Sequence, residues 1–408
     1  MSAQDAPLTP VRRLPQGEFV ALLAVLFAMT AFSIDAMLPA MPDIAAELSP
    51  DVPNRAQFII TSFVFGMGAG TFLTGPLSDA LGRKAVILGG VVLYCFGAVL
   101  AWAAPSLPLM LAARALQGLG VAGPRVAGMA LVRDLYSGRQ MARIVSFVMM
   151  IFVLIPAVAP LFGSFVIAGF GWRGIFAAFI LFALVTSTWF SLRQPETLPK
   201  AARRPLRAGT LLAATSEILG NRLVVMVIAV LTLGFASLFA MISSTQQVFD
   251  LHFGLAESFP YWFAFIALVS GLGSILNARL VVRLGMRRMI SAAYLFQTAN
   301  SALILILFGL GLVPAGIEFW VYLYWTISVF FMTGLTIGNL NALALEPMGH
   351  IAGTAASFIT ALATVLSVVL AAPIGLAFDG TPVPLMIGVF LCCLGATALV
   401  FNLPPAER

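Results

Sequence analysis

Charged side chains are scarce in this chain of 408 residues. Asp, Glu, Lys and Arg together make up 9% of the sequence, whereas 61% of its residues are hydrophobic. A water-soluble globular domain carries charge on about a quarter of its residues, so these charges are too few to cover a surface that faces water. Apolar runs recur instead, at the length of about 20 residues that a helix needs to cross a ~30 Å hydrocarbon core. The composition predicts an integral membrane protein.

Cysteine and histidine are also rare, with three Cys and two His. The cysteines all lie in apolar runs, and His252 and His350 fall in or near predicted loops, away from any nucleophile or metal-ligand set. The sequence shows no strictly alternating strands of a β-barrel and no glycine-rich loop for ATP or a dinucleotide. We therefore expect no disulfide framework, no metal, no cofactor and no enzyme activity.

Twelve apolar segments are predicted to span the membrane as helices. They are residues 19–40, 56–78, 85–104, 108–131, 142–167, 174–192, 222–245, 259–281, 289–312, 318–342, 352–376 and 383–402. The first is too long for the apolar part of a signal peptide, so we expect it to remain uncleaved. A basic, Pro-rich segment, 193–210, falls near the middle. This pattern predicts an all-α membrane fold with an N-terminal six-helix bundle (1–192), a cytoplasmic linker (193–221) and a C-terminal six-helix bundle (222–408).

Lysine and arginine fall almost entirely on one side of the predicted membrane. If the N-terminus is cytoplasmic, only Arg55 and Arg173 lie outside and only Arg114 and Arg125 lie within a span, while the other Lys and Arg residues all lie inside. Such a bias sets the orientation of membrane proteins, so we expect both termini in the cytoplasm. It also accounts for the net charge of +6 through contact with anionic lipids rather than nucleic acid.

The two halves of the chain are weakly similar. The stretch GPLSDALGRK (75–84) follows the second predicted span, and ARLVVRLGMRR (278–288) follows the eighth. Aligning their Leu-Gly pairs places Gly82 on Gly285, and Val282 then stands where Asp79 would be. Parallel six-helix repeats are one known design of membrane transporters, and the offset of about half the chain is consistent with that design.

GPLSDALGRK also predicts a turn with a charge cluster at the inner ends of spans 2 to 4. Gly75 permits close helix packing, and Gly82 permits a tight turn. Asp79 can pair with Arg83, and Asp134 in span 4 is a second acceptor. The simpler alternative is the ordinary positive flank of a membrane helix. The complete pattern favours a gate that holds one side of the molecule shut, made of Gly75, Asp79, Gly82, Arg83, Lys84 and Asp134.

One acid lies inside the first predicted span. Asp35 is the only charge between Phe19 and Met41, and an acid at the centre of a membrane helix costs about 2.5–3.5 kcal/mol on insertion. Arg114 falls at a comparable depth in span 4, so we expect a facing Asp35–Arg114 pair. The arginine would stabilise the carboxylate, whereas burial would disfavour its charge. This balance suits a group that takes up and releases a proton; a structural acid is the alternative.

These motifs together resemble those of a known transporter family. Gly75-x-x-x-Asp79-x-x-Gly82-Arg83-Lys84 resembles motif A of the major facilitator superfamily, and RALQGLGVAG (114–123) resembles its span-4 motif B. IPAVAPLFGSFV (155–166) is similar to a variant of antiporter motif C, with Ala159-Pro160 in place of Gly-Pro, and GWRGIFAAF (171–179) to the start of span 6 in bacterial drug exporters. SIDAMLPAMPDIA (33–45) resembles the span-1 signature of the bicyclomycin/chloramphenicol-resistance (Bcr/CflA) subfamily.

The resemblance implies a drug:proton antiporter of the bacterial inner membrane that alternates between inward-open and outward-open states. Motif B places an arginine like Arg114 near the proton-handling acid, and motif C favours a hinge or seal at Pro156, Pro160 and Gly163 over an ordinary proline kink. Substrate-lining residues are expected on spans 1, 4, 7 and 10, from large apolar and amide side chains. They are Met29, Phe32, Asp35, Gln117, Met241, Gln246, Tyr322, Tyr324, Trp325, Asn339 and Asn341.

The expected function is therefore the export of small amphipathic organic molecules, such as drugs or antibiotics, in exchange for protons. Because Asp35 is the single acid and Arg114 opposes it, neutral or monocationic molecules fit better than dications. Two alternatives remain, a proton-coupled uptake symporter for a metabolite and a non-transporting membrane scaffold or receptor. We expect a monomer whose partners are its substrate, protons and membrane lipids.

Overall fold

The computed structural model describes residues 14–203 and 208–404, and the long regular elements in these ranges are α-helices. The long helices are α1 (Gln16–Asp35), α3 (Phe58–Leu81), α4 (Arg83–Trp102), α5 (Leu107–Leu135), α6 (Gly138–Phe170), α7 (Gly174–Arg193), α9 (Arg222–Gln247), α10 (Phe259–Leu284), α11 (Met286–Gly309), α12 (Ala315–Leu345), α13 (Ala352–Leu376) and α14 (Val383–Phe401). Two shorter ones are α2 (Met41–Leu48) and α8 (Ala208–Gly220).

The helices confirm the prediction of twelve spans. Eleven stretches of the described chain are long and apolar enough to cross a membrane, and one of them, Ala315–Leu376, contains both α12 and α13. A short 3₁₀ segment, η5 (Glu346–Ile351), separates these two helices, and Met348 within it has non-helical backbone angles. The protein is therefore a multi-pass membrane protein.

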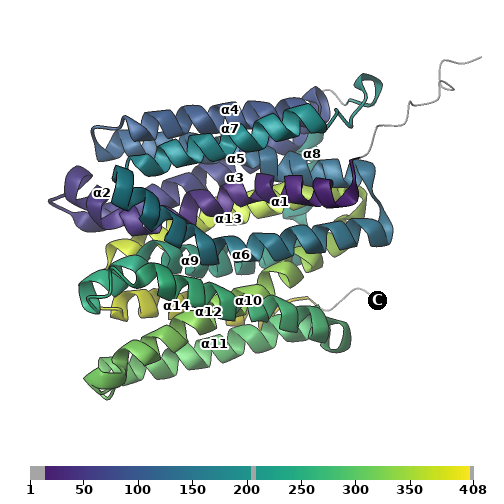
Figure 1. Cartoon of the computed structure of the whole chain (residues 1–408). Coiled ribbons are helices and arrows are strands. Elements are labelled where there is room, and N and C mark those ends of the chain that lie inside the picture. The colour runs from purple at the N-terminus through teal and green to yellow at the C-terminus, as the bar shows by residue number, and fades with distance from the viewer. Residues whose placement is uncertain (1–13, 204–207, 405–408) are drawn as a thin grey trace, which may run out of the picture.

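The helices form two bundles of six, which lie one above the other in Figure 1. The first bundle contains α1 and α3–α7, and the second contains α9–α14. The bundles meet where α3 packs against α13 and where α6 packs against α10. The end of the molecule where α1 begins and α14 ends holds Arg83, Lys84 and Arg193; we call it the basic end. The opposite end, which holds α2 and carries Asp43 and Glu47, is called the acidic end.

A break in the first span separates α1 from α2. The last backbone hydrogen bond of α1 runs from Ala36 N–H to the Phe32 carbonyl at 3.1 Å, and a 3₁₀ turn (Leu38–Ala40) follows. Pro39 causes the break, because it has no N–H to donate to the carbonyl four residues earlier, that of Asp35. The backbone carbonyls around Asp35 are thereby released from helical bonding.

Close helix packing in the first bundle depends on small residues of α5. A Cβ at Gly118 would overlap the backbone of Phe63 on α3, and a Cβ at Gly120 would overlap that of Tyr94 on α4. Membrane helices associate through such close approaches, because lipid supplies no hydrophobic drive between them. The glycines of RALQGLGVAG thus bring α5 against both neighbours.

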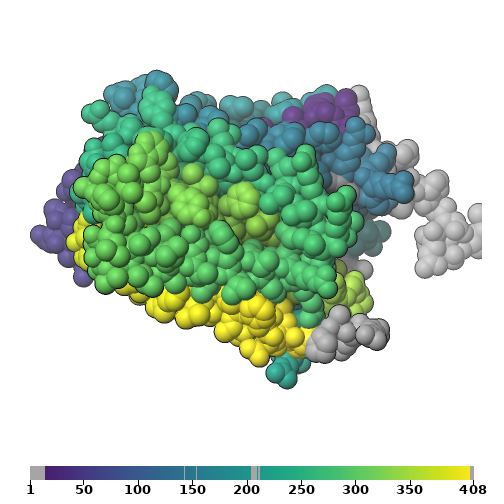
Figure 2. Space-filling view, turned by 90° about the horizontal axis from the view of Figure 1, so that it is seen from below, coloured from purple at the N-terminus to yellow at the C-terminus, as the bar shows by residue number. Residues whose placement is uncertain are grey.

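The outer surface of the second bundle is apolar. Figure 2 shows this surface, with green α10–α12 beside yellow α14. Large hydrophobic side chains that are 47–60% exposed cover it, among them Phe265, Leu268, Leu272, Ile275, Leu295, Phe296, Leu303, Ile306, Trp320 and Tyr324. Such exposure would be unfavourable in water, and it is the surface expected of helices that face lipid.

The segment between the bundles contains more structure than its sequence suggested. Helix α8 lies within the predicted linker 193–221, and His350 of η5 pairs with Glu217 of α8 at 2.7 Å. Five arginines that the orientation prediction places on the inner side, Arg12, Arg13, Arg204, Arg207 and Arg408, lie outside the described residues.

Candidate functional site

A cavity of about 350 Å³ lies between the two bundles. Helices α1, α3, α5 and α6 line it from the first bundle, and α9, α10 and α12 from the second. Most of the lining is apolar, and it includes the five phenylalanines Phe152, Phe235, Phe239, Phe263 and Phe330. Hydroxyl groups of Thr30, Ser270, Ser274 and Thr333 and two charged residues, Asp35 and Arg125, complete its polar part. Ligand sites are typically apolar cavities of this size with a few polar groups.

Asp35 lines this cavity at the end of α1. It is 4% exposed, and within residues 14–203 and 208–404 no hydrogen bond or ion pair reaches its carboxylate. A buried charge without a partner is costly. Binding of a proton would remove this charge, and a donor or cationic group of a ligand would pair with it, so either would lower the cost of burying Asp35.

The expected pair between Asp35 and Arg114 is wrong for this structure. Arg114 is completely buried, and it donates instead to the Ser33 carbonyl at 2.9 Å, to Gln117 Oε1 at 2.6 Å and to the Ile59 carbonyl at 3.4 Å. Its guanidinium also lies over the Phe63 ring, 4.4 Å from the centroid. Asp35 and Arg114 do lie at a similar depth in the membrane, as expected. Arg114 binds the backbone carbonyl of Ser33 near the end of α1, however, and the Asp35 carboxylate faces the cavity.

Most of the predicted substrate-lining residues lie outside this cavity. Only Asp35 of that set lines it. In the first bundle, Phe32 packs on Phe162, Phe179 and Phe182, Met29 is in the core, and Gln117 binds Arg114.

The predicted lining residues of the second bundle are also placed elsewhere. Trp325 donates to Ser301 at 3.0 Å and packs beside the tilted ring of Tyr322, while Tyr324 is 49% exposed on the outer surface. Asn339 bonds to Asn277 and Asn341 to the Ile337 carbonyl, Met241 is in the core, and Gln246 lines a smaller pocket at the acidic end. The four helices expected to line the cavity do so, but through other faces, since successive residues point 100° apart around a helix. Helices α3, α6 and α10, which were not expected there, line it as well.

Arg125 is a cavity residue whose role the sequence left open. It lies in the part of α5 nearer the basic end, and its one hydrogen-bond partner within the described chain is the thioether of Met67, with Nη1 to Sδ at 3.5 Å. Thioether sulfur is a weak acceptor. The cavity thus contains one poorly partnered charge of each sign.

At the acidic end, uncharged side chains connect the two bundles. Gln57 donates to Gln247 Oε1 at 2.5 Å and to the Gly375 carbonyl at 3.1 Å, and Ser244 donates to Gln57 Oε1 at 2.9 Å. Asn54 accepts from Gln247 at 2.7 Å and donates to the Phe378 carbonyl. We call this set the amide latch. It joins the 3₁₀ turn that precedes α3 (Pro53–Gln57) to α9 and to the end of α13, and so holds the bundles together at this end.

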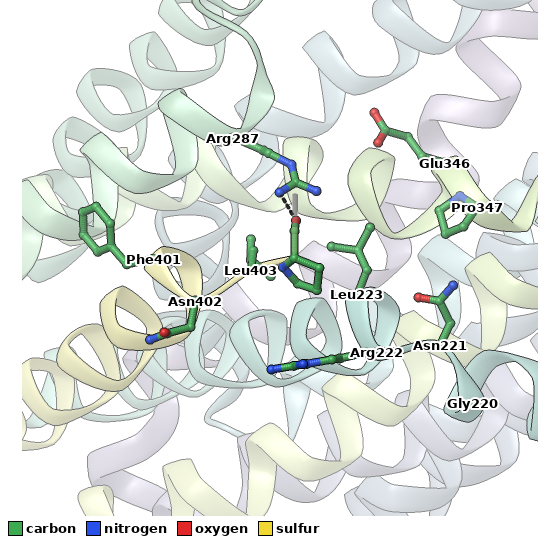
Figure 3. A pocket seen from close by; sticks show the side chains of 11 residues that line it. Gly220, Asn221, Arg222, Leu223, Arg287, Glu346, Pro347, Phe401, Asn402 and Leu403 are labelled. Carbon is green, nitrogen blue, oxygen red and sulfur yellow. Dashed lines mark hydrogen bonds between the residues drawn. The ribbon is translucent and has the colours of Figure 1, made fainter. Parts of the chain in front are cut away.

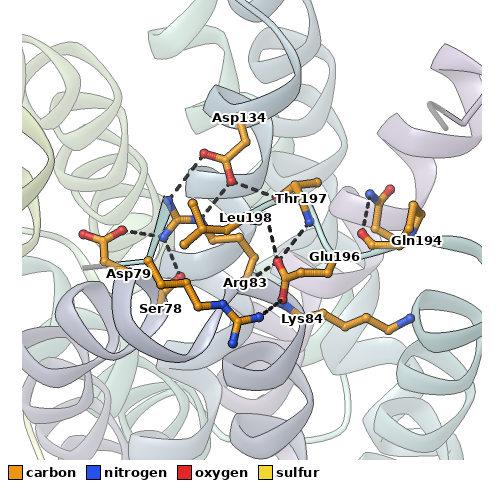
Figure 4. Close-up of polar contacts among 11 residues, drawn as sticks. Ser78, Asp79, Arg83, Lys84, Asp134, Gln194, Glu196, Thr197 and Leu198 are labelled. Carbon is orange, nitrogen blue, oxygen red and sulfur yellow. Dashed lines mark hydrogen bonds and ion pairs between the residues drawn. The ribbon is translucent and has the colours of Figure 1, made fainter. Parts of the chain in front are cut away.

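Of the predicted gate residues, Asp79, Arg83 and Asp134 form a charge cluster at the basic end, drawn in Figure 4. Arg83 pairs with Asp79 at 2.5 Å and with Asp134 at 2.9 Å. Gly82 begins the turn with φ +102°, a conformation that favours glycine. Within the part of the chain that the structure describes, the hydrogen bonds of Arg83 all remain within the first bundle and the segment after α7. A direct tie between the bundles through this cluster, as expected of a gate, is thus not formed here.

Glu196 belongs to this cluster and was not predicted. It accepts hydrogen bonds from the backbone N–H groups of Arg83 at 3.0 Å and Lys84 at 3.1 Å, the first two residues of α4 (Figure 4). A carboxylate at this position satisfies free N–H groups and complements the helix dipole. The cap comes from 112 residues away in sequence, so no local signal would have revealed it.

The second bundle carries a related turn at the basic end. Gly285 has φ +81° and precedes α11 as Gly82 precedes α4. Lys84 donates to the Ser191 carbonyl near the end of α7, and Arg287 to the Pro404 carbonyl beyond α14 (Figure 3). These matching contacts accord with the proposed repeat. Arg287 also lines an open polar pocket of about 720 Å³ beside Arg222 and Glu346 (Figure 3).

Helix α6 passes through both of the prolines expected at a hinge and remains one helix from Gly138 to Phe170. Pro156 lines the central cavity. One turn after Pro160, a Cβ at Gly163 would overlap the backbone carbonyl of Ala36. Gly163 therefore lets α6 approach the break at the end of α1, directly beside Asp35.

Two six-helix bundles surround a central cavity with a buried acid that has no partner in the described chain, and this arrangement is typical of a membrane transporter of small molecules. The chain belongs to the Major Facilitator Superfamily, whose family model matches residues 22–372. This family consists of transporters, in agreement with the expectation that the protein is not an enzyme.

Among curated proteins, the chain is 31% identical to a bicyclomycin resistance protein homolog of Haemophilus influenzae, over 84% of each chain. It is 27% identical to the multidrug resistance protein MdtL of Salmonella heidelberg, over 91% of each. The fold is similar to that of the xylose transporter XylE from E. coli in a partially occluded inward-open conformation, with a TM-score of 0.76 at 12% identity over 96% of this chain and 98% of the other. The predicted family and fold are confirmed.

Proposed function

We propose that this protein exports small amphipathic organic molecules across the bacterial inner membrane in exchange for protons. The observation that carries this proposal is Asp35, a buried carboxylate that lines the cavity between the bundles and has no partner among the described residues. An ionisable residue inside a membrane helix is costly, and it is usually kept for transport of ions or protons. The basic end then faces the cytoplasm, since Lys and Arg accumulate on that side.

The proposed cycle follows from the two ends of the molecule. The units 1–192 and 222–408 rock against each other about the cavity, and the segment 193–221 connects them. Closing the amide latch excludes the outside, and opening it lets a proton reach Asp35. Protonation neutralises the carboxylate and weakens its hold on a substrate that carries a donor or a positive charge, so proton entry favours substrate release to the outside. The charge cluster around Arg83 stiffens the basic end of the first bundle during this movement.

The relatives support the direction and the class of substrate. The names of the two curated relatives refer to resistance to bicyclomycin and to multiple drugs, and resistance through a transporter requires export. The apolar cavity with five phenylalanines suits amphipathic organic molecules, because aromatic walls adapt to varied shapes. With a single acid in the cavity, neutral or monocationic molecules are preferred to dications.

Transport by purified protein in vesicles tests the proposal. A pH gradient across the membrane should drive wild-type protein to concentrate an amphipathic drug on the acidic side, and Asp35→Asn should abolish this accumulation. Asp43→Asn is the matched control, since Asp43 is an exposed acid on α2 outside the cavity. Full accumulation by Asp35→Asn would refute the role of Asp35, and robust export of dications would refute the substrate class.

An uptake symporter on the same fold is the second candidate. The chain shares its fold with a xylose transporter. A fold by itself does not determine the direction of transport, so uptake remains a candidate. It predicts accumulation together with the proton rather than against it. The same vesicles decide between the two, since only the direction of substrate movement relative to the pH gradient differs.

A further inference from the structure

The central cavity has two charged groups that reach it from different depths. Asp35 is close to the level of Arg114, because Arg114 donates to the Ser33 carbonyl. Arg125 lies eleven residues further along α5 toward the basic end, which is on the order of 16 Å of helix at 1.5 Å per residue. The phenylalanines line the same cavity. A molecule that occupies it therefore has an acid toward one end, a cation toward the other and an aromatic wall around its body.

Arg125 has spare hydrogen-bonding capacity. A guanidinium has five N–H donors, and the one acceptor that reaches it in the described chain is the Met67 thioether. The contrast with Arg114 is direct, since Arg114 uses three oxygen acceptors and one aromatic ring. Arg114 is a structural arginine whose donors are engaged, whereas the donors of Arg125 remain available to a ligand.

We infer that Arg125 binds the substrate and selects molecules that carry a hydrogen-bond acceptor or a negative group at the end that lies toward the basic end of the protein. This inference rests on the proposed function, because it assigns a substrate class to the same cavity. Suitable groups are carbonyl, carboxamide, nitro and carboxylate oxygens, which accept from the planar fork of a guanidinium. A quaternary ammonium at that position meets a like charge in an apolar cavity and is rejected.

The charge of the cavity then depends on Asp35. When Asp35 is protonated, the cavity has a net charge of +1, that of Arg125, and a molecule with a hydrogen-bond acceptor fits best. With Asp35 ionised, the two charges cancel, and a molecule with a donor at one end and an acceptor at the other satisfies both. The inferred substrates are thus neutral or zwitterionic molecules with an aromatic or aliphatic body, and simple monocations are excluded from the wider class proposed above.

Direct binding to the full-length protein in lipid nanodiscs, without a gradient, tests this inference. Two probes share one butylphenyl body and differ only at its end, which is a carboxamide in one and a trimethylammonium group in the other. We expect wild-type protein to bind the carboxamide at least tenfold more tightly by calorimetry. Arg125→Met should reduce carboxamide affinity about tenfold to a hundredfold, as for loss of a hydrogen bond to a charged group, and should increase binding of the ammonium probe.

Two further variants separate the effect of the charge at Arg125 from that of its hydrogen bonds and control for the loss of an arginine elsewhere. Arg125→Lys retains the charge without the planar fork, and it should still reject the ammonium probe while binding the carboxamide more weakly than wild type. Arg279→Met is the matched control, because Arg279 is exposed near the end of α10 and does not line the cavity; it should leave both affinities unchanged.

An unchanged preference in Arg125→Met would overturn the inference, and so would equal binding of the two probes by wild type. If Arg125→Met does not fold, binding of the ammonium probe is measured with Arg125→Gln instead. Binding of that probe as weak as in wild type would overturn the inference. Because binding is measured without a gradient, the result does not depend on direction or proton coupling. Failure of the vesicle experiment with intact selectivity would refute the transport proposal alone.

Discussion

Arg114 donates a hydrogen bond to the backbone carbonyl of Ser33, two residues before Asp35, and leaves the carboxylate to the cavity. The arginine thereby stabilises the break in the first span rather than neutralising the acid. The two residues have separate tasks at one level of the membrane. Arg114 holds the end of α1 against α5 and α3, and Asp35, although buried, lines the cavity and can contact a molecule that enters it.

Replacing Arg114 by lysine should destabilise the protein. An ammonium group cannot reach the Ser33 and Ile59 carbonyls and the Gln117 oxygen together, and each buried acceptor left unpaired costs about 1–3 kcal/mol. We expect Arg114→Lys to unfold at a clearly lower temperature in detergent. Arg139→Lys, on an exposed residue at the start of α6, should unfold like wild type. Equal stability of the two variants would contradict this account of Arg114.

Gly163 should tolerate no side chain. A methyl group there would overlap the Ala36 carbonyl, and forcing an atom into packed structure costs about 1–3 kcal/mol. Gly163→Ala should therefore lower the unfolding temperature and, by shifting the end of α1, reduce drug transport. Gly169→Ala is the control in the same helix, because a Cβ there meets no atom within 4 Å. A Gly163→Ala variant as stable and active as that control would show that the close approach is unimportant.

The amide latch should control access from the acidic end. Gln57→Met keeps the length of the side chain and removes its bonds to Gln247, Ser244 and Gly375, each worth about 1 kcal/mol net. In a protein without native cysteines, Ala267→Cys places a thiol on the cavity wall. We expect Gln57→Met to speed its labelling by an impermeant reagent added at the acidic end about tenfold.

The control for the latch is Gln297→Met. Gln297 is also buried, but it bonds to Ser301 within the second bundle and should not change labelling at Ala267→Cys. Labelling that is equally slow in both variants would mean that the latch does not limit opening at the acidic end.

Glu196 should anchor the segment that follows α7. Its carboxylate accepts from the N–H groups of Arg83, Lys84, Thr197 and Leu198. Glu196→Ala removes this cap, so trypsin should cut faster at Lys200 and Arg203, and Glu196→Gln should be intermediate because it retains one acceptor oxygen. Glu217→Ala, which affects only a half-exposed pair with His350, serves as control. Unchanged cleavage after Glu196→Ala would show that the segment is held by other contacts.

Much of the architecture was predictable from the sequence. Apolar length revealed the spans, and the motif GPLSDALGRK revealed the turn at Gly82 with the Arg83 pairs to Asp79 and Asp134. These features are local, or they depend on helix ends that the membrane brings to the same level. The cavity lining was not predictable in the same way. Met29, Phe32 and Trp325 lie on the expected helices, but they face the interior of their own bundles.

The sequence by itself determined that this chain spans the membrane twelve times and carries one acid within its first span, because both depend only on where apolar and charged residues fall along the chain. The tertiary structure decided which groups meet. It turned Arg114 toward the backbone carbonyl of Ser33 near the end of α1, opened the Asp35 carboxylate and the Arg125 guanidinium to one cavity, and placed Glu196 at the start of α4. Such contacts depend on the rotation of each helix about its axis and on the packing of distant segments, which the order of residues does not reveal by itself.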